Sequence, residues 1–159
     1  MTIAVGDRIP DVTLYHMTDD GPAEIRTSDI FDGKKVLLFA VPGAYTPTCS
    51  KAHLPGYVVN ADAIKAKGVD TIACLAVNDV FVMGAWGEVS NAENILMLAD
   101  GSAKFTAAVG IELDLTDRGL GMRSDRYAMI VEDGVVTALN REGPGKFEVS
   151  DADTMMGLI

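Results

Sequence analysis

One cysteine, Cys49, lies where a reactive thiolate is favoured. It belongs to the run Pro-Gly-Ala-Tyr-Thr-Pro-Thr-Cys-Ser at residues 42–50. An apolar run at 36–41 precedes this segment, and a stretch with helical periodicity follows it. The thiol is therefore expected beyond the end of a buried strand and in the first turn of a helix, where backbone N–H groups and the helix dipole favour negative charge. Because the thiolate is the nucleophilic form of cysteine, the sequence predicts chemistry at this residue.

The segments around Cys49 alternate between strand and helix patterns. Residues 35–41 indicate a buried strand, and apolar residues at 54, 58, 61 and 64 mark one face of the following helix. Pro55-Gly56 interrupts that face, so a kink or a broken first turn is expected there. The remaining expected elements are strands at 69–77 and 94–99, helices at 80–89 and 103–109, a hairpin of 126–132 and 135–140 around Asp133-Gly134, and a last helix opened by a capping box at 150–153.

This order predicts an α/β fold in which helices flank a central mixed β-sheet. No repeat, low-complexity tract or linker divides the chain, and a length of 159 residues suits one domain spanning residues 1–159. Functional sites in such sheets gather at the carboxyl ends of the strands. Cys49 follows the carboxyl end of the first strong strand, so its position and its chemistry agree.

Composition excludes several classes of function. Lys and Arg number 13 against 23 Asp and Glu, and a domain with a formal charge of -10 and no basic cluster is a poor candidate for nucleic acid or anionic membranes. No apolar stretch approaches the ~20 residues of a membrane span, and no secretory signal is visible. The two cysteines form no disulfide framework, which favours a reducing cytoplasm. Two histidines and two cysteines lack metal-ligand spacing, so neither metal nor cofactor is expected.

The segment at 42–49 matches the P-x-x-x-T-x-x-C signature of the peroxiredoxins, and its residues resemble those of the type II branch of that family. The similarity continues at residues 53–57, 73–79, 85–87 and 119–127, so it covers nearly the whole chain. The resemblance implies a thioredoxin-like (redoxin) domain. It also implies a homodimer, with the region around Trp86 forming part of the interface.

Site residues follow from the same resemblance, position by position. Cys49 resembles the peroxidatic cysteine, whose thiolate attacks a peroxide oxygen and becomes a sulfenic acid. Thr46 resembles the threonine that contacts thiolate and peroxide, and Pro42 the proline that shields the site from water. Arg126 resembles the family arginine, whose fixed charge favours the thiolate and stabilises charge on the leaving oxygen. Arg123 is the alternative, but Arg126 directly precedes the following strand, as in the family pattern.

Two further residues leave alternatives open. Cys74 lies inside an apolar strand, where a buried and inert thiol is the better interpretation. His53 follows Cys49 by four residues, so both could share a helix face. It could tune the thiolate or only hydrogen-bond backbone at the kink.

The region 143–159 contains no cysteine, whereas some type II members carry a resolving cysteine there. The resemblance therefore implies that an external thiol completes the cycle, with glutathione and glutaredoxin favoured over thioredoxin. The resemblance thus implies a thiol-dependent peroxidase that reduces hydrogen peroxide and alkyl hydroperoxides.

A peroxide-sensing redox switch, or a binding protein that uses Cys49 oxidation, is the alternative function. A disulfide reductase is disfavoured because the chain has no C-x-x-C pair: the residue three before Cys49 is Thr46.

Overall fold

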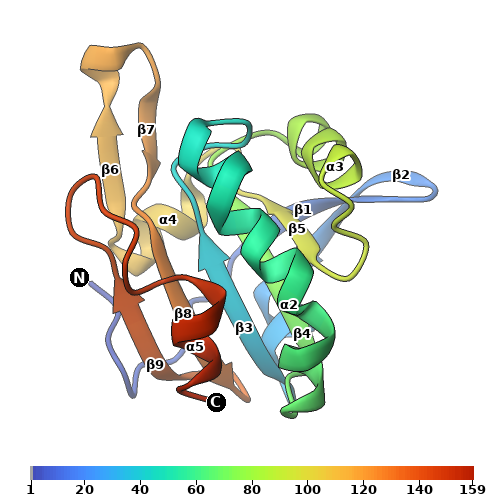
Figure 1. Ribbon diagram of the computed structural model, residues 1–159. Helices are drawn as coiled ribbons and strands as arrows, with labels where there is room; N and C mark the ends of the chain where they lie inside the picture. Colours follow the sequence, from blue (N-terminus) through green and yellow to red (C-terminus); the bar gives the residue numbers. More distant parts are fainter. Residues whose placement is uncertain (1) are drawn as a thin grey trace.

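Seven strands form one mixed sheet in the computed structural model, which describes residues 2–159 (Figure 1). These strands are β1 (Thr13–Thr18), β2 (Gly21–Arg26), β3 (Lys35–Ala40), β4 (Thr71–Ala76), β5 (Leu96–Ala99), β8 (Tyr127–Glu132) and β9 (Val135–Arg141). Their spatial order is β2-β1-β5-β4-β3-β8-β9, with β3, β4 and β5 parallel and the outer pairings antiparallel. Two more strands, β6 (Glu112–Leu115) and β7 (Gly121–Ser124), pair in a separate small sheet.

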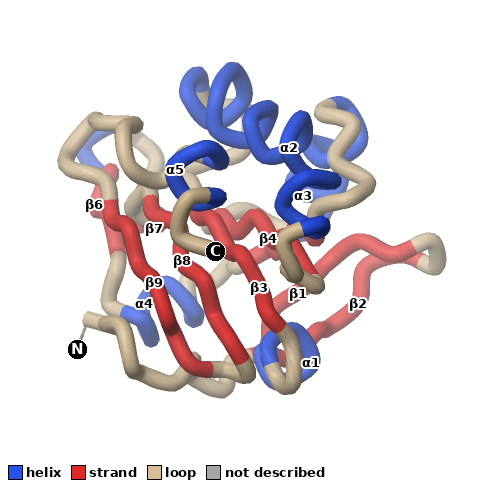
Figure 2. Tube along the Cα trace, turned by 60° about the horizontal axis from the view of Figure 1, so that its bottom comes forward, coloured by secondary structure: helices blue, strands red, loops and turns tan. Residues whose placement is uncertain are grey.

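Helices cover both faces of the seven-stranded sheet, which confirms the expected α/β class. They are α1 (Thr27–Phe31), α2 (Leu54–Ala66), α3 (Val80–Val89), α4 (Lys104–Val109) and α5 (Ala152–Met156). Figure 2 shows α2, α3 and α5 over one face and α1 and α4 on the other. Because successive strand residues point to opposite faces, Leu37 and Phe39 of β3 join the core under α2, whereas Val36 and Leu38 join the core beside α1 and α4.

The hairpin predicted around Asp133-Gly134 is confirmed between β8 and β9. Both turn residues adopt left-handed backbone, with φ of 49° at Asp133 and 79° at Gly134. Such a turn matches the twist of the flanking strands and favours Asp-Gly.

A second hairpin, β1–β2, was not expected from the sequence. Residues 18–20 are polar and precede Gly21-Pro22. Thr18 pairs with Gly21 across the turn, and the Thr18 hydroxyl donates a 2.7 Å hydrogen bond to the Gly21 carbonyl. The half-exposed strands lack the apolar run that marks β3 and β4, so local sequence gave little signal.

The helix that carries Cys49 has helical backbone from Pro47 onward and a widened π turn, η1, at Cys49–His53. In this turn the Leu54 N–H donates to the Cys49 carbonyl, five residues back. Pro55 follows directly and has no N–H to donate. The interruption expected there is therefore a wide turn within a continuous helical segment, and α2 then runs to Ala66.

The last helix begins one residue later than expected. Asp151, not Ser150, caps α5, and its carboxylate accepts hydrogen bonds from the N–H and hydroxyl of Thr154. The Ser150 hydroxyl instead donates to Glu142, at 2.6 Å.

Candidate active site around Cys49

Strand pairing brings the expected site residues together. β3 and β8 are antiparallel neighbours, and Ala40 at the end of β3 pairs with Tyr127 at the start of β8. Arg126, which directly precedes β8, therefore lies beside the loop that leaves β3 and leads to Cys49. Residues 77 positions apart in the sequence meet at this edge of the sheet.

Arg126 contacts the sulfur of Cys49. Its Nη2 group donates to Sγ at 3.1 Å, and both side chains are buried. Arg123 lies elsewhere, with Nε donating to the Leu120 carbonyl at 2.8 Å and Nη1 to the Pro42 carbonyl at 3.4 Å. Of the two candidate arginines, Arg126 is thus the one whose charged guanidinium contacts the sulfur.

Thr46 and Pro42 lie in the loop before Cys49. The Thr46 hydroxyl donates to the Gly43 carbonyl at 2.7 Å, and its carbonyl accepts from Ser50 N–H in the first helical turn. No hydrogen bond joins Thr46 to the Cys49 sulfur among residues 2–159. Pro42 is half-buried, and its carbonyl accepts from Arg123.

Gly43 and Asn78 shape this loop, and the sequence analysis missed both. A Cβ at Gly43 would lie 3.0 Å from Arg123 Nη1 and 3.2 Å from Thr46 Cγ2, so these side chains would have to shift by a few tenths of an ångström to admit it. Asn78 follows β4, and its side-chain oxygen accepts from the Ala44 N–H at 2.9 Å. An asparagine at the carboxyl end of a buried parallel strand was the available signal.

His53 is fully buried and bridges Arg126 to the C-terminal segment. Its Nδ1 accepts from Arg126 Nη1 at 2.8 Å, so the ring proton belongs on Nε2, which donates to the Ser150 carbonyl at 3.0 Å. Burial, and then the adjacent Arg126 charge, lower the pKa of His53 from 6.5 to about 3. The imidazole is therefore neutral at physiological pH. It bonds to backbone, as one of the two alternatives has it, and it also contacts Arg126, which itself contacts the Cys49 sulfur.

Glu142 is a buried carboxylate that the sequence gave no reason to select. It is 5% exposed and accepts from the Ser150 hydroxyl and from the N–H groups of Glu148, Val149 and Ser150. Burial alone would raise the pKa of Glu142, but these hydrogen bonds outweigh it and leave the pKa below its usual value.

Cys74 lies in β4 and is fully buried in the same core as Cys49. Burial raises the pKa of the Cys74 thiol well above its usual value. A neutral, buried thiol fits the inert interpretation given to this residue.

Trp86 is 1% exposed, so the indole itself is not available to a partner. Its Nε1 group donates instead to the Ser50 hydroxyl, next to Cys49, at 3.1 Å. Nearby on α3, Phe81 and Val89 are exposed.

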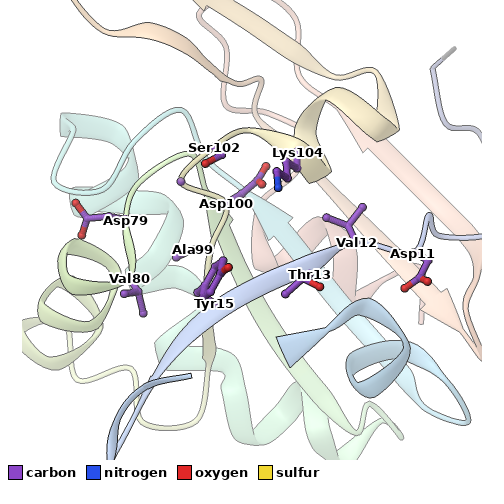
Figure 3. Close-up of a pocket in the computed structure, with 11 residues that line it drawn as sticks. Asp11, Val12, Thr13, Tyr15, Asp79, Val80, Ala99, Asp100, Ser102 and Lys104 are labelled. Atoms are coloured by element: carbon purple, nitrogen blue, oxygen red, sulfur yellow. The ribbon is translucent and has the colours of Figure 1, made fainter. Parts of the chain in front are cut away.

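A cavity of about 480 Å³ lies away from Cys49, between β1, the end of β5 and the starts of α3 and α4 (Figure 3). None of the residues singled out from the sequence lines it. Its most buried carboxylate, Asp100, accepts from the N–H groups of Phe105 and Thr106 and from the Thr106 hydroxyl. Asp100 thus serves to start α4 rather than to present charge to the cavity.

Two further features of residues 2–159 bear on function. No group of three or more His, Cys, Asp or Glu side chains in this range is arranged to hold a metal ion. No helix within it is long and apolar enough to cross a membrane.

The arrangement at Cys49 suits nucleophilic chemistry by the sulfur. The sulfur sits in the first helical turn with one guanidinium against it, and both features favour the anion over the thiol. When the sulfur attacks a substrate, the guanidinium is also placed to stabilise the negative charge that develops on the leaving group.

Comparisons with known proteins agree with this chemistry. The family model described as Redoxin matches residues 4–156. Peroxiredoxin-2E-2, chloroplastic, of Oryza sativa subsp. japonica is 50% identical, over 98% of this chain and 72% of that protein. Peroxiredoxin-2B of Arabidopsis thaliana is 46% identical, over 97% of this chain and 96% of that protein. The crystal structure of reduced Prx3 from Vibrio vulnificus in complex with hydrogen peroxide superposes with a TM-score of 0.96, at 58% identity and 99% coverage of both chains.

Proposed function

Since the chain belongs to the redoxin family and is a peroxidase of the peroxiredoxin type, we propose that it reduces hydrogen peroxide and alkyl hydroperoxides through Cys49 and is recycled by an external thiol. The single observation that carries the assignment of Cys49 is the 3.1 Å hydrogen bond from Arg126 to its sulfur. Hydrogen peroxide is supported as a substrate because the similar Vibrio vulnificus protein has been crystallised with it.

The first step is a two-electron oxidation of sulfur. The Cys49 thiolate attacks the terminal peroxide oxygen, an S–O bond forms, and the O–O bond breaks. The leaving oxygen takes a proton and departs as water or an alcohol, which leaves Cys49 as a sulfenic acid. Arg126 stabilises the thiolate before the step and the charge on the leaving oxygen during it.

Thr46 completes the substrate site in this proposal. Its hydroxyl proton is committed to the Gly43 carbonyl, so its oxygen lone pairs are free to accept a hydrogen bond from a peroxide O–H. Such a bond would hold the O–O axis in line with the sulfur. Pro42, half-buried at the start of the loop, would limit entry of water.

An external thiol is proposed to complete the cycle. Cys74 is buried in β4, and residues 143–159 contain no cysteine. One thiol displaces water from the sulfenic acid to give a mixed disulfide, and a second thiol releases the Cys49 thiolate and leaves as a disulfide. Glutathione with glutaredoxin is the preferred reductant, with thioredoxin second. Because the Cys49 sulfur is fully buried, the turn around it must open before a thiol of that size reaches it.

A coupled peroxidase assay tests the proposal. Turnover of hydrogen peroxide is measured with glutathione plus glutaredoxin and, separately, with thioredoxin plus its reductase. Faster turnover with the glutathione system supports the reductant assignment, and the reverse order overturns it. Absence of turnover with both systems and with a small dithiol would overturn the peroxidase itself.

A peroxide-sensing redox switch is the second candidate. The complete burial of the Cys49 sulfur favours it, since slow access by a reductant would leave the oxidised form long-lived. The two functions differ in steady state: a switch oxidises once per molecule and recycles slowly, whereas an enzyme turns over many times with the same thiol present.

We also propose a homodimer and a reducing, cytoplasmic setting. The exposed apolar side chains of Tyr45, Phe81 and Val89 support an interface near Trp86, although Trp86 itself is buried. Two free cysteines support a reducing compartment. Sedimentation of the purified chain tests the first proposal, and fractionation of cells tests the second.

A further inference from the structure

The segment after β9 folds back against the site and is clamped by one carboxylate. Oε2 of Glu142 accepts from the N–H groups of Val149 and Ser150 at 2.9 and 2.8 Å and from the Ser150 hydroxyl at 2.6 Å. The Glu148 N–H donates to both carboxylate oxygens. Glu142 is itself anchored beside the site, because its N–H donates to the Arg126 carbonyl at 2.9 Å. We call residues 142–150 the clamped segment.

The clamp fixes the direction of one carbonyl group. The Ser150 carbonyl accepts from Tyr57 Oη at 2.7 Å and from His53 Nε2 at 3.0 Å. Burial raises the pKa of Tyr57 well above its usual value, so its hydroxyl is a permanent donor. Both lone pairs of the carbonyl oxygen are then used. Because this oxygen can only accept hydrogen bonds, its bond with His53 requires a proton on Nε2.

That carbonyl selects the tautomer of His53, and the tautomer in turn orients Arg126. With the proton on Nε2, the Nδ1 lone pair faces Arg126 Nη1 at 2.8 Å, and the second arm of the guanidinium reaches the Cys49 sulfur. With the proton on Nδ1, two N–H groups would face each other and the arginine would turn away. The guanidinium is planar and its donors are fixed relative to one another. The hydrogen bond between Nη1 and His53 therefore sets the position of Nη2, which donates to the Cys49 sulfur.

The clamped segment also covers the arginine. The Phe147 ring lies 5.8 Å from the Arg126 guanidinium carbon and 4.8 Å, between centroids, from the His53 ring. Loss of the clamp would therefore expose the His53–Arg126 pair to water as well as release the carbonyl.

We propose that Glu142 is a positioning residue for Cys49, acting through Ser150, His53 and Arg126 without touching the sulfur. This role rests on the proposed function of Cys49 as the reactive thiol. It makes the clamped segment, which lies outside the cysteine motif, a determinant of thiolate reactivity.

Glu142→Gln tests this role with little change in size. The variant keeps an acceptor oxygen but replaces the other with an NH2 group that faces N–H donors. Its matched control is Glu148→Gln, the same chemical change on an exposed side chain of the clamped segment. We expect the midpoint of Cys49 alkylation against pH to move to higher pH in Glu142→Gln, and the rate of oxidation by hydrogen peroxide to fall about tenfold at neutral pH, the worth of one charge-assisted hydrogen bond. Glu148→Gln should match the unmodified protein in both.

Alkylation needs no peroxide, so the test separates the two hypotheses. A protein that alkylates normally at Cys49 but never turns over peroxide contradicts the proposed function and leaves the comparison of variants valid. An active, folded Glu142→Gln variant with an unchanged alkylation curve and oxidation rate overturns the positioning role alone.

The ring nitrogens of His53 supply a second readout that does not depend on the variant's folding. In the unmodified protein, 15N spectra must show Nε2 protonated and Nδ1 unprotonated at neutral pH, with His16 as a reference in the same sample. A protonated Nδ1 overturns the proposal. In folded Glu142→Gln we expect signals from both tautomers, which a merely destabilising substitution would not produce.

Discussion

His53 and Arg126 face one another at 2.8 Å, yet only one of these two basic side chains carries charge. An arginine side chain in a protein is a donor only, so the imidazole must be the acceptor in this hydrogen bond. Its Nδ1 therefore carries no proton. This pairing points the second arm of Arg126 at Cys49, and no carboxylate within residues 2–159 forms an ion pair with Arg126.

The neutral state of His53 makes folding stability depend on pH. Its pKa is 6.5 in the unfolded chain and about 3 when folded, so between these values only the unfolded chain binds the proton. The free energy of unfolding should therefore fall as pH falls through this window, by about 1.4 kcal/mol per pH unit from this group. Urea titrations between pH 6.5 and 5 measure the slope before most carboxylates protonate. The charged groups that act on the ring are Arg126, Glu142 and Asp151.

His53→Gln should flatten this dependence, because glutamine has a donor and an acceptor but does not titrate. His16→Gln, which removes the distant histidine in β1, should keep the steep slope. A His53→Gln protein as pH-sensitive as its parent would contradict a buried neutral imidazole.

Arg126→Ala should slow the oxidation of Cys49 by hydrogen peroxide by about a hundredfold, the effect of losing one preorganised charged donor. Arg126→Lys should recover only part of the rate, because a single ammonium cannot bond His53 and Cys49 as the two arms of the guanidinium do. Stopped-flow measurements of the oxidation rate give the comparison. Arg123→Ala is the control, and a larger loss there than at Arg126 would reassign the arginine.

Substitution of the two cysteines should have different effects on peroxide turnover and on stability. Cys49→Ser should abolish peroxide turnover, since a serine hydroxyl is not ionised at neutral pH. Cys74→Ser should keep turnover and lower the melting temperature, because a hydroxyl replaces a thiol in the buried core beneath α2. Coupled assays and thermal melts report the two effects, and loss of turnover in folded Cys74→Ser would make that residue part of the cycle.

Gly43→Ala should reduce peroxide turnover with little loss of stability. The added methyl would lie 3.0 Å from Arg123 Nη1 and 3.2 Å from Thr46 Cγ2, so the threonine side chain must move by a few tenths of an ångström. Gly56→Ala is the matched control: nothing lies within 4 Å of its Cβ position, and alanine in a helix should stabilise the protein by up to about 1 kcal/mol. Equal activity in both variants would show that the position of Thr46 is not critical.

The sequence predicted the buried elements well because their signal is local. The apolar runs of β3 and β4 and the Asp133-Gly134 turn are determined by their own residues. The hairpin β1–β2 and the small sheet β6–β7 were missed because half-exposed strands are stabilised by their partners.

The site divides in the same way. Cys49 stood out through its neighbours in the chain, and Arg126 through a family motif. Glu142 could not be found, since its function is visible only when the N–H groups of 148–150 converge on it. The same holds for the capping of α5, because the sequence does not show that Asp151 is the cap and that the Ser150 hydroxyl donates to Glu142.

The pairing of β3 with β8 has a consequence for the newly made chain. Cys49 and Arg126 lie 77 residues apart, and they meet only when an antiparallel strand from the second half docks at the end of β3. Contacts of such separation form late, because a long loop must close first. During synthesis and early folding the thiol therefore lacks its contact with Arg126. Peroxide would therefore oxidise Cys49 slowly in a chain still on the ribosome. The onset of rapid oxidation would mark the moment at which the fold is complete.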